Sequence, residues 1–274
     1  MSEPSPIVDH NALRWRDGKA SPIVRALAEE TPVAITYDGQ AHAVLMATPA
    51  DLGDLAVGFT LSEGIAAFSD LGAVTVTEAT EGMVADVALS ARAQAGLATA
   101  RERTMASRTS CGLCGVTSLE EAVRPLPHLS GGPTVTAQAL HRALIELEGE
   151  QTLGRETRAT HAAAWAGADG SLRVVREDVG RHNALDKLIG AAARAGLDPS
   201  QAFIVVTSRC SYEMVEKTAL AGVTVLVAIS APTALAIRKA EEANLTLVAL
   251  ARADGHMVFT GGERLTGPMA EAAE

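Results

Sequence analysis

The sequence of 274 residues has few aromatic side chains, few cysteines and a shortage of positive charge. Phe, Trp and Tyr make up only 3% of it, so a core has to be built from Ala, Val, Leu and Ile. Because buried parallel strands consist of aliphatic runs, this composition favours an α/β protein. The formal net charge of −10 argues against broad binding to nucleic acid or to an anionic membrane, since such binding needs an excess of Lys and Arg.

Targeting and membrane segments are also missing from the sequence. Residues 1–6 contain no basic residues followed by an apolar run, and no apolar run reaches the roughly 18 residues of a membrane-spanning helix. The chain has three cysteines, of which two form a CxxC pair, and this pattern does not fit a secreted disulfide framework. We therefore expect a cytoplasmic protein.

We expect residues 1–105 to contain an N-terminal arm and a small α+β domain. Residues 1–20 are polar and contain Pro, which predicts a loosely held arm. Asp38-Gly39 lies between two apolar stretches and favours a tight hairpin turn. Thr48 can cap the helix that follows, and Gly64 is expected to end it. The predicted strands of this domain are 32–37, 41–46, 74–77 and 84–89.

Residues 134–274 predict a second domain of the α/β class, and residues 106–133 form the loop and linker between the two. Strands and helices alternate in the second domain, which implies right-handed crossovers and a mixed, largely parallel sheet. The turn Asp169-Gly170 predicts a hairpin before this alternating part. The predicted strands are 161–165, 172–176, 203–207, 223–229, 245–250 and 257–260. The predicted helices are 136–147, 181–195, 212–221 and 232–243.

Polar residues follow the carboxyl ends of several predicted strands, where open α/β sheets bind ligands. Hydroxyls, guanidinium groups and helix N-termini would meet at this edge and would suit a phosphate group. The sequence has no GxGxxG or Walker A motif, so it does not support a standard Rossmann or P-loop nucleotide site. The segments are 178–183, 208–211, 230–233 and 251–255, and they include Arg209, Ser230 and Arg252.

A structural interpretation applies to several residues of these segments. Taken singly, Asp178 and Ser230 are more readily helix caps than ligands. His182 lies four residues before Asp186, which fits a structural hydrogen bond on one helix face. Cys210 fits a small buried residue better than a reactive thiol.

The segment 107–117 contains Cys111 and Cys114 and has no apolar period, so we expect a mobile loop. A lone CxxC supplies only two of the four ligands of a structural zinc site, and no His-x-Glu precedes it as zinc deaminases require. Dithiol exchange of the thioredoxin type needs a helix N-terminus at the pair, whereas a helix is predicted only from Ser118.

Sulfur relay fits the pair best. A thiolate can accept sulfur as a persulfide, and the second thiol can release that sulfur by forming a disulfide. An inert pair of cysteines is the remaining alternative.

Six segments carry motifs, namely Val57–Ile65, Ser110–Gly115, Thr160–Ala164, Arg176–Gly190, Arg209–Val215 and Ser230–Ala236. In these segments the sequence resembles the formate dehydrogenase accessory sulfurtransferase family (FdhD), and the similarity covers residues 30–265. The resemblance implies a sulfur carrier that takes sulfur from a cysteine desulfurase. The resemblance further implies that this carrier would pass the sulfur to the bis-molybdopterin guanine dinucleotide cofactor, with molybdenum or tungsten, before the cofactor enters formate dehydrogenase.

The resemblance also implies roles for residues and a fold. Cys111 would carry the persulfide with Cys114 as its partner, and the chain would form a homodimer. The C-terminal domain would have the three-layer topology of cytidine deaminases without their zinc chemistry. A delivery chaperone that binds the cofactor without sulfur transfer is the alternative function. The implied cofactor-binding stretch is Leu250, Ala251, Arg252, Ala253, Asp254 and Gly255, to which the strand-end argument adds Arg209 and Ser230.

Overall fold

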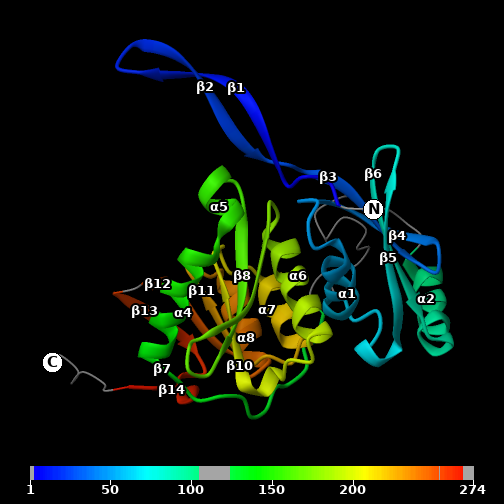
Figure 1. Cartoon of the computed structure of the whole chain (residues 1–274). Helices are drawn as coiled ribbons and strands as arrows, with labels where there is room; N and C mark the ends of the chain where they lie inside the picture. The colour runs from blue at the N-terminus through cyan, green and yellow to red at the C-terminus, as the bar shows by residue number, and fades with distance from the viewer. Residues whose placement is uncertain (1–2, 105–123, 253, 268–274) are drawn as a thin grey trace. The chain divides into compact units, whose positions relative to one another are not determined.

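The computed structural model describes residues 3–104, 124–252 and 254–267 (Figure 1). The chain divides into two compact units, and each is made of several segments. Unit 1 comprises residues 1–124, 151–162 and 176–191, and unit 2 comprises residues 125–150, 163–175 and 192–274. These units differ from the domains expected from the sequence, which were continuous segments with bounds at 1–105, 106–133 and 134–274. The difference arises because strands β8 (His161–Gly167) and β9 (Leu172–Asp178) each run from one unit into the other.

Unit 1 contains a four-stranded sheet with the strand order β4-β3-β6-β5. Strands β3 and β6 are parallel, and the two outer pairs are antiparallel hairpins. The predicted hairpins are confirmed, including the turn at Asp38-Gly39. Val33, Ile35 and Val87 are fully buried in the core of this unit. The strands are β3 (Thr31–Tyr37), β4 (Gln40–Ala47), β5 (Leu71–Ala79) and β6 (Gly82–Leu89).

Among the described residues, unit 1 also contains the helices α1 (Leu52–Ser62), α2 (Ala91–Thr104), α5 (Thr152–Thr157) and most of α6 (Arg181–Arg194). Helix α1 is followed by Gly64 at a φ of 67°, as predicted. A short 3₁₀ turn, Phe68–Asp70, precedes β5. The predicted cap at Thr48 is wrong, because α1 begins only at Leu52. The Thr48 hydroxyl instead accepts a hydrogen bond from the amide of Val179.

Helices α1 and α6 approach each other most closely at two glycines. A Cβ atom on Gly58 would overlap the backbone carbonyl of Asp186, and a Cβ atom on Gly190 would overlap that of Asp54. The two helices therefore need glycine at both positions for their backbones to meet. The sequence motifs 57–65 and 176–190 are in this respect packing motifs.

The first 28 residues form structure that the sequence interpretation missed. Strands β1 (Ile7–Arg16) and β2 (Lys19–Ala28) pair along their full length in an antiparallel hairpin, so the expected loose arm at 1–20 is wrong. The two strands form a sheet of their own among the described residues. Asp17 and Gly18 both have positive φ in the turn, which is the same Asp-Gly signal that was used at Asp38-Gly39.

Unit 2 is built on most of a six-stranded sheet with the order β13-β12-β11-β10-β8-β9. The three central strands β10, β11 and β12 are parallel, whereas β8 and β13 pair with them in antiparallel fashion. The sheet is thus mixed, and its parallel part is limited to these three strands. Every residue of β10 and β11 is buried and aliphatic apart from Phe203, as the scarcity of aromatic residues predicts. The further strands are β10 (Ala202–Val206), β11 (Val225–Ala228), β12 (Thr246–Arg252) and β13 (Gly255–Thr260).

The helices of unit 2 are α4 (Ala137–Glu150), α7 (Tyr212–Leu220) and α8 (Ala234–Glu242), close to their predicted positions. Helices α7 and α8 pack on each other, and α4 and α8 both contact β12. Two short 3₁₀ turns, Pro199–Gln201 and Gly262–Arg264, and the two-residue strands β7 (Val135–Thr136) and β14 (Leu265–Thr266) complete the unit. The order of the parallel strands places the loops after β10, β11 and β12 at one edge of the sheet.

Candidate functional site

The loops that follow the three parallel strands are joined to one another by backbone hydrogen bonds. The amide of Cys210 donates to the carbonyl of Ala231 at 3.2 Å, and the amide of Thr233 donates to the carbonyl of Cys210 at 2.9 Å. The amide of Leu250 donates to the carbonyl of Ser230 at 3.3 Å. The segments 208–211 and 229–233 and the described residues of 250–255 are therefore adjacent to one another, and we call them the strand-end edge. The convergence predicted from the sequence is confirmed for these three segments.

Two guanidinium groups belong to the strand-end edge. The guanidinium of Arg252 donates hydrogen bonds to the carbonyl of Ile229 and, at 3.1 Å, to the carbonyl of Ala251. Arg252 and Arg209 are both exposed, and Ser230 beside them is half-buried. An exposed guanidinium whose position is fixed by backbone acceptors can bind a phosphate or carboxylate group. Asp254, also exposed, adds one negative charge to the same edge.

The backbone at Leu250 has an unusual conformation. Its φ is 52°, in the left-handed region, and the pairing of β12 with β13 shifts register between Ala249 and Arg252. Such bulges redirect the side chains that follow them and are common next to functional sites. Here the irregularity leaves Leu250 41% exposed while Ala251 is buried. Strain at this position is a reason to regard the 250–255 segment as functional.

The thiol of Cys210 is part of the scaffold of this edge. Its side chain is fully buried, and burial raises the pKa of the thiol to about 12. A thiol with this pKa is protonated at neutral pH and is a poor nucleophile. The interpretation of Cys210 as a small buried residue is confirmed. Cys111, Cys114 and Ala253 lie outside the described residues.

The segment around Asp178 has a structural role that the sequence indicated only in part. The Asp178 carboxylate accepts a hydrogen bond from the amide of Gly180 at 2.8 Å; Gly180 precedes the first residue of α6, so this bond closes a turn before the helix and is not the predicted cap on its first amides. It also accepts one from the amide of Thr48 at 3.0 Å and from the side chain of Asn183 at 3.0 Å. Lys187 forms a fully buried ion pair with it, with 2.6 Å between the ammonium nitrogen and the carboxylate oxygen. These contacts hold the start of α6 against the segment between β4 and α1.

Two neighbouring residues of the same motif also hold unit 1 together. Arg176 forms ion pairs with Asp54 at 2.7 Å and with Asp51 at 3.5 Å. Glu177 accepts hydrogen bonds from the first amides of α5, those of Leu153 and Gly154, where a negative charge also suits the helix dipole. Sequence reasoning missed these roles because the partners of Arg176 lie more than 120 residues away.

Three cationic or titratable side chains gather near the start of α6. Burial and the positive charge of Arg181 lower the pKa of His161, and His182 contributes in the same direction. The Nε atom of Arg181 is buried and has no hydrogen-bond partner among the residues that the structure describes. Asp186, the predicted partner of His182, accepts a hydrogen bond from the hydroxyl of Ser62 at 2.5 Å. These residues belong to unit 1, whereas the strand-end edge belongs to unit 2.

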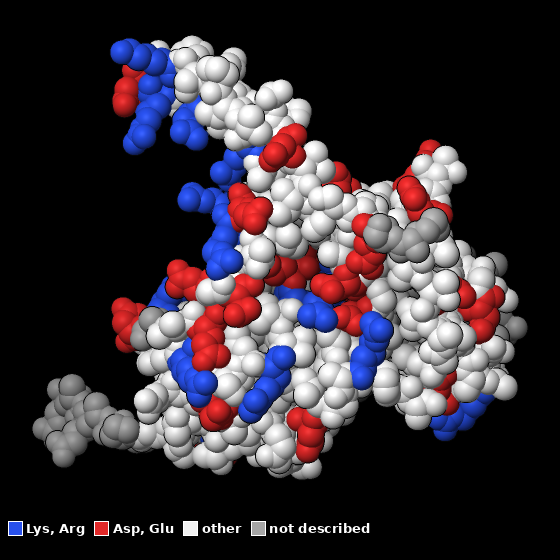
Figure 2. Space-filling view, viewed as in Figure 1, with Lys and Arg blue, Asp and Glu red and all other residues white. Residues whose placement is uncertain are grey.

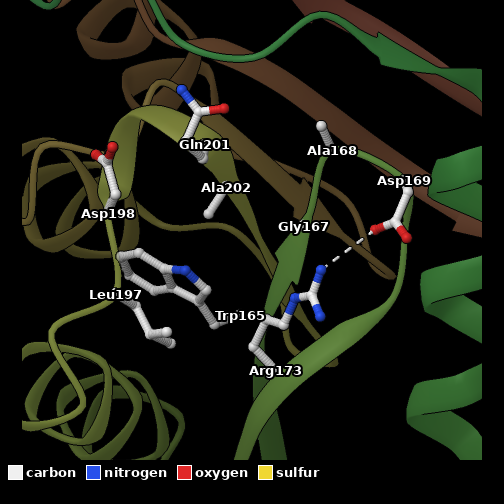
Figure 3. A pocket seen from close by; sticks show the side chains of 9 residues that line it. All are labelled: Trp165, Gly167, Ala168, Asp169, Arg173, Leu197, Asp198, Gln201 and Ala202. Atoms are coloured by element: carbon white, nitrogen blue, oxygen red, sulfur yellow. Dashed lines mark ion pairs between the residues drawn. The ribbon is translucent and has the colours of Figure 1, made fainter.

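A cavity of about 370 Å³ lies elsewhere in unit 2 (Figure 3). Its walls include Gly167, where β8 ends, and Ala202, where β10 begins, so it lies at the end of β10 opposite the strand-end edge. Figure 3 shows Trp165 at the cavity and an ion pair between Asp169 and Arg173, whose atoms are 3.9 Å apart. The sequence interpretation assigned Asp169 to a turn only and did not predict this cavity.

The described part of the chain has neither a cluster of metal ligands nor a membrane-spanning helix. No group of three or more His, Cys, Asp or Glu side chains in that part is placed to hold a metal ion. His141 and His256 do contact each other, with 3.2 Å between their ring nitrogens, but they are only two. No helix among the described residues has the length and apolar character needed to cross a membrane.

Comparison with known proteins identifies the family. The family model described as FdhD/NarQ matches residues 28–266, which is most of the chain. The chain belongs to the FdhD/NarQ family. The match begins at residue 28 and therefore excludes nearly all of the β1–β2 hairpin, whereas it includes all three segments of the strand-end edge.

Curated members of the FdhD/NarQ family and one solved structure resemble the chain over most of its length. The sulfur carrier protein FdhD of Cupriavidus necator is 47% identical, over 92% of this chain and 88% of the relative. That of Agrobacterium fabrum is 49% identical, over 91% of this chain and 93% of the relative. A crystal structure from Desulfotalea psychrophila, assigned as a formate dehydrogenase accessory protein, matches with a TM-score of 0.77 at 22% identity. It covers 96% of this chain and 100% of its own and supports the fold.

Proposed function

We propose that the chain is a cytoplasmic sulfur carrier that accepts persulfide sulfur from a cysteine desulfurase. It transfers this sulfur to the bis-molybdopterin guanine dinucleotide cofactor, with molybdenum or tungsten, on which formate dehydrogenase depends. The observation that carries the proposal is the strand-end edge, with its two exposed guanidinium groups, in a chain of the FdhD/NarQ family. The names of the relatives support a role in sulfur transfer and in the maturation of formate dehydrogenase.

The first step assigns the acceptor role to Cys111. Its thiolate attacks the outer sulfur of the persulfide on the desulfurase, the S–S bond of the donor breaks, and the donor thiolate leaves. Cys111 then carries the persulfide, and no net oxidation or reduction has occurred. In the second step Cys114 attacks the inner sulfur, an internal disulfide forms, and sulfide passes to the cofactor. The disulfide must then be reduced by a cellular dithiol before the next cycle.

The strand-end edge is the proposed binding surface for the nucleotide part of the cofactor. The cofactor carries pyrophosphate groups, and Arg209 and Arg252 are suited to bind them. The hydroxyl of Ser230 and the backbone at Asp254 and Gly255 would supply further hydrogen bonds. The cofactor is here a substrate and cargo of the protein.

Mass spectrometry tests the sulfur-carrier role. After incubation with a cysteine desulfurase and cysteine, the native chain should gain the mass of one sulfur atom, and Cys111→Ala should not. Cys210→Ala is the matched control, because the buried Cys210 should have no part in loading. An equal gain of mass by Cys111→Ala would contradict the proposal.

A delivery chaperone without sulfur transfer is the second candidate, because the strand-end edge could bind the cofactor without either thiol. In this case a Cys111→Ala, Cys114→Ala double variant should restore formate dehydrogenase activity in cells that lack the native protein. Under the sulfur-carrier proposal this variant should fail. The homodimer and the three-layer, cytidine-deaminase-like topology of the C-terminal domain also remain proposals.

A further inference from the structure

The β1–β2 hairpin, residues 7–28, has two chemically different faces, and we call it the arm. Directly opposite residues of an antiparallel pair share a face, and every second residue along a strand returns to it. The register pairs Leu13 with Pro22 and Trp15 with Ala20, and these four residues with Val24 make one face apolar near the turn; we call it the apolar face, although Asp9 and Asn11 share it further from the turn. The other face carries the basic side chains of Arg14, Arg16, Lys19 and Arg25, together with His10 and the apolar residues Val8, Ala12, Ile23 and Leu27.

The apolar face is exposed to an extent that is unusual for large side chains. Trp15 is 71% exposed, and Leu13 and Val24 are each 67% exposed. The arm contacts helix α5 through its other face, where the guanidinium of Arg25 donates a hydrogen bond to the carbonyl of Thr157 at 3.1 Å. A two-stranded hairpin is marginally stable by itself, and a contiguous apolar face on such a ribbon marks an interaction surface.

The charge of the arm is opposite to that of the rest of the chain. The arm contains four Lys and Arg residues and two Asp residues, a net charge of +2, whereas the remaining residues carry −12. Figure 2 shows Lys and Arg gathered at the turn end of the ribbon that Figure 1 labels β1 and β2. The arm is therefore complementary in charge to the chain's own acidic remainder, and two arms would repel each other.

We propose that the arm docks on the acidic body of a second copy of this chain and is the element that holds the homodimer together. The inference rests on the homodimer proposed above and adds the surface that forms it. In a symmetric dimer each arm would contact the partner, so the same contact would occur twice. The apolar face would be covered, and the basic face would lie beside carboxylates of the second copy.

The size of the arm is sufficient for this role. With ten residues in each strand, one face is about 33 Å long and about 10 Å wide, from the usual rise and strand spacing. Two reciprocal contacts, counted on both partners, would bury roughly 1,300 Å², and stable interfaces bury roughly 1,200–2,000 Å².

Sedimentation velocity on the full chain, at several protein and salt concentrations, tests the proposal. The apolar variant Leu13→Ser, Trp15→Ser and the charge variant Arg14→Glu, Arg16→Glu should each weaken dimerisation at least about tenfold, a difference of about 1.4 kcal/mol. The native dimer should also weaken as salt is added, because charges between partners are screened. Circular dichroism on each variant confirms that the fold is retained.

Matched controls carry the same changes away from the arm. Val44→Ser alters a valine that is 58% exposed on β4, and Arg238→Glu alters an exposed arginine on α8, and both should dimerise as the native chain does. A native chain that stays monomeric at about 50 μM would overturn the proposal and leave a different acidic protein as the occupant of the arm. A dimer that either arm variant leaves unchanged would also overturn it.

The outcome is separable from that of the sulfur-carrier proposal. Persulfide loading is measured by mass spectrometry on the same samples. If loading fails while the arm variants weaken the dimer, only the sulfur chemistry is refuted. If loading succeeds while dimerisation does not depend on the arm, only the arm proposal is refuted.

Discussion

Replacing Lys187 by Met should lower the free energy of unfolding by about 3–5 kcal/mol, the usual loss when one partner of a buried ion pair is removed. The ammonium of Lys187 lies 2.6 Å from the Asp178 carboxylate, and both side chains are fully buried. It also donates hydrogen bonds to the carbonyls of Thr48 at 2.9 Å and Glu177 at 3.4 Å. The variant leaves a buried carboxylate without its counter-charge and two carbonyls without a donor.

Urea unfolding followed by circular dichroism measures this loss. Lys239→Met is the matched control, because its partner Glu242 has a side chain that is 57% exposed, and an ion pair with an exposed group contributes about 0–1 kcal/mol. The double variant Lys187→Met, Asp178→Asn should recover part of the loss, since it removes the unpaired charge but not the unsatisfied carbonyls. A loss below about 1 kcal/mol for Lys187→Met would refute the buried pair.

Three further predictions concern single residues. In the native chain Cys210 should be inert to Ellman's reagent at pH 8 and should react only after unfolding, because it is buried with a pKa of about 12; rapid reaction would place it at the surface. Arg181→Gln should raise the pKa of His161 measured by NMR, because the positive charge of Arg181 lowers it. Since burial and Arg181 keep the pKa of His161 below 6.5, the folded chain should lose stability as the pH falls below 6.5. An unchanged pKa of His161 in Arg181→Gln would contradict the proximity of the two side chains. Gly58→Ala should destabilise the chain by about 1–3 kcal/mol or more in urea unfolding, whereas Gly149→Ala, with open space around it, should be neutral or stabilising; equal effects would refute the close helix contact.

The parts of the fold that follow from local rules could be predicted from the sequence. Asp38-Gly39 forces a tight turn, and Gly64 ends α1, because few residues adopt positive φ without strain. The aliphatic runs of the second domain form strands, because strands that are buried on both faces of a sheet consist of such runs. The arm was missed although Asp17-Gly18 gives the same turn signal. Its strands are mostly exposed, and Asp9 and Asn11 interrupt the apolar alternation of β1 on which strand prediction depends.

Strand direction is a property that local rules do not determine. Alternating strands and helices led to the expectation of a largely parallel sheet, and β10, β11 and β12 obey it. Strand β8 continues through a hairpin into β9, which runs in the opposite direction. Helix α6 then connects β9 to β10, and β10 therefore runs parallel to β9 and pairs with β8 in antiparallel fashion. The direction of a strand thus depends on contacts between segments that are far apart in the sequence. The periodicity of apolar residues gives no information about these contacts.

The same distinction between local rules and distant contacts explains which part of the candidate site could be predicted from the sequence. The strand-end edge was predictable because parallel neighbours place their carboxyl ends together, and Cys210, Ser230 and Leu250 are joined there. The motif 176–190 looked like a second part of a ligand site, yet Arg176 and Lys187 use their charges on partners inside unit 1. A charged motif therefore indicates a binding site only when its charges are not already neutralised by the fold. By that criterion the exposed guanidinium groups of the strand-end edge are the stronger candidates for contact with the cofactor.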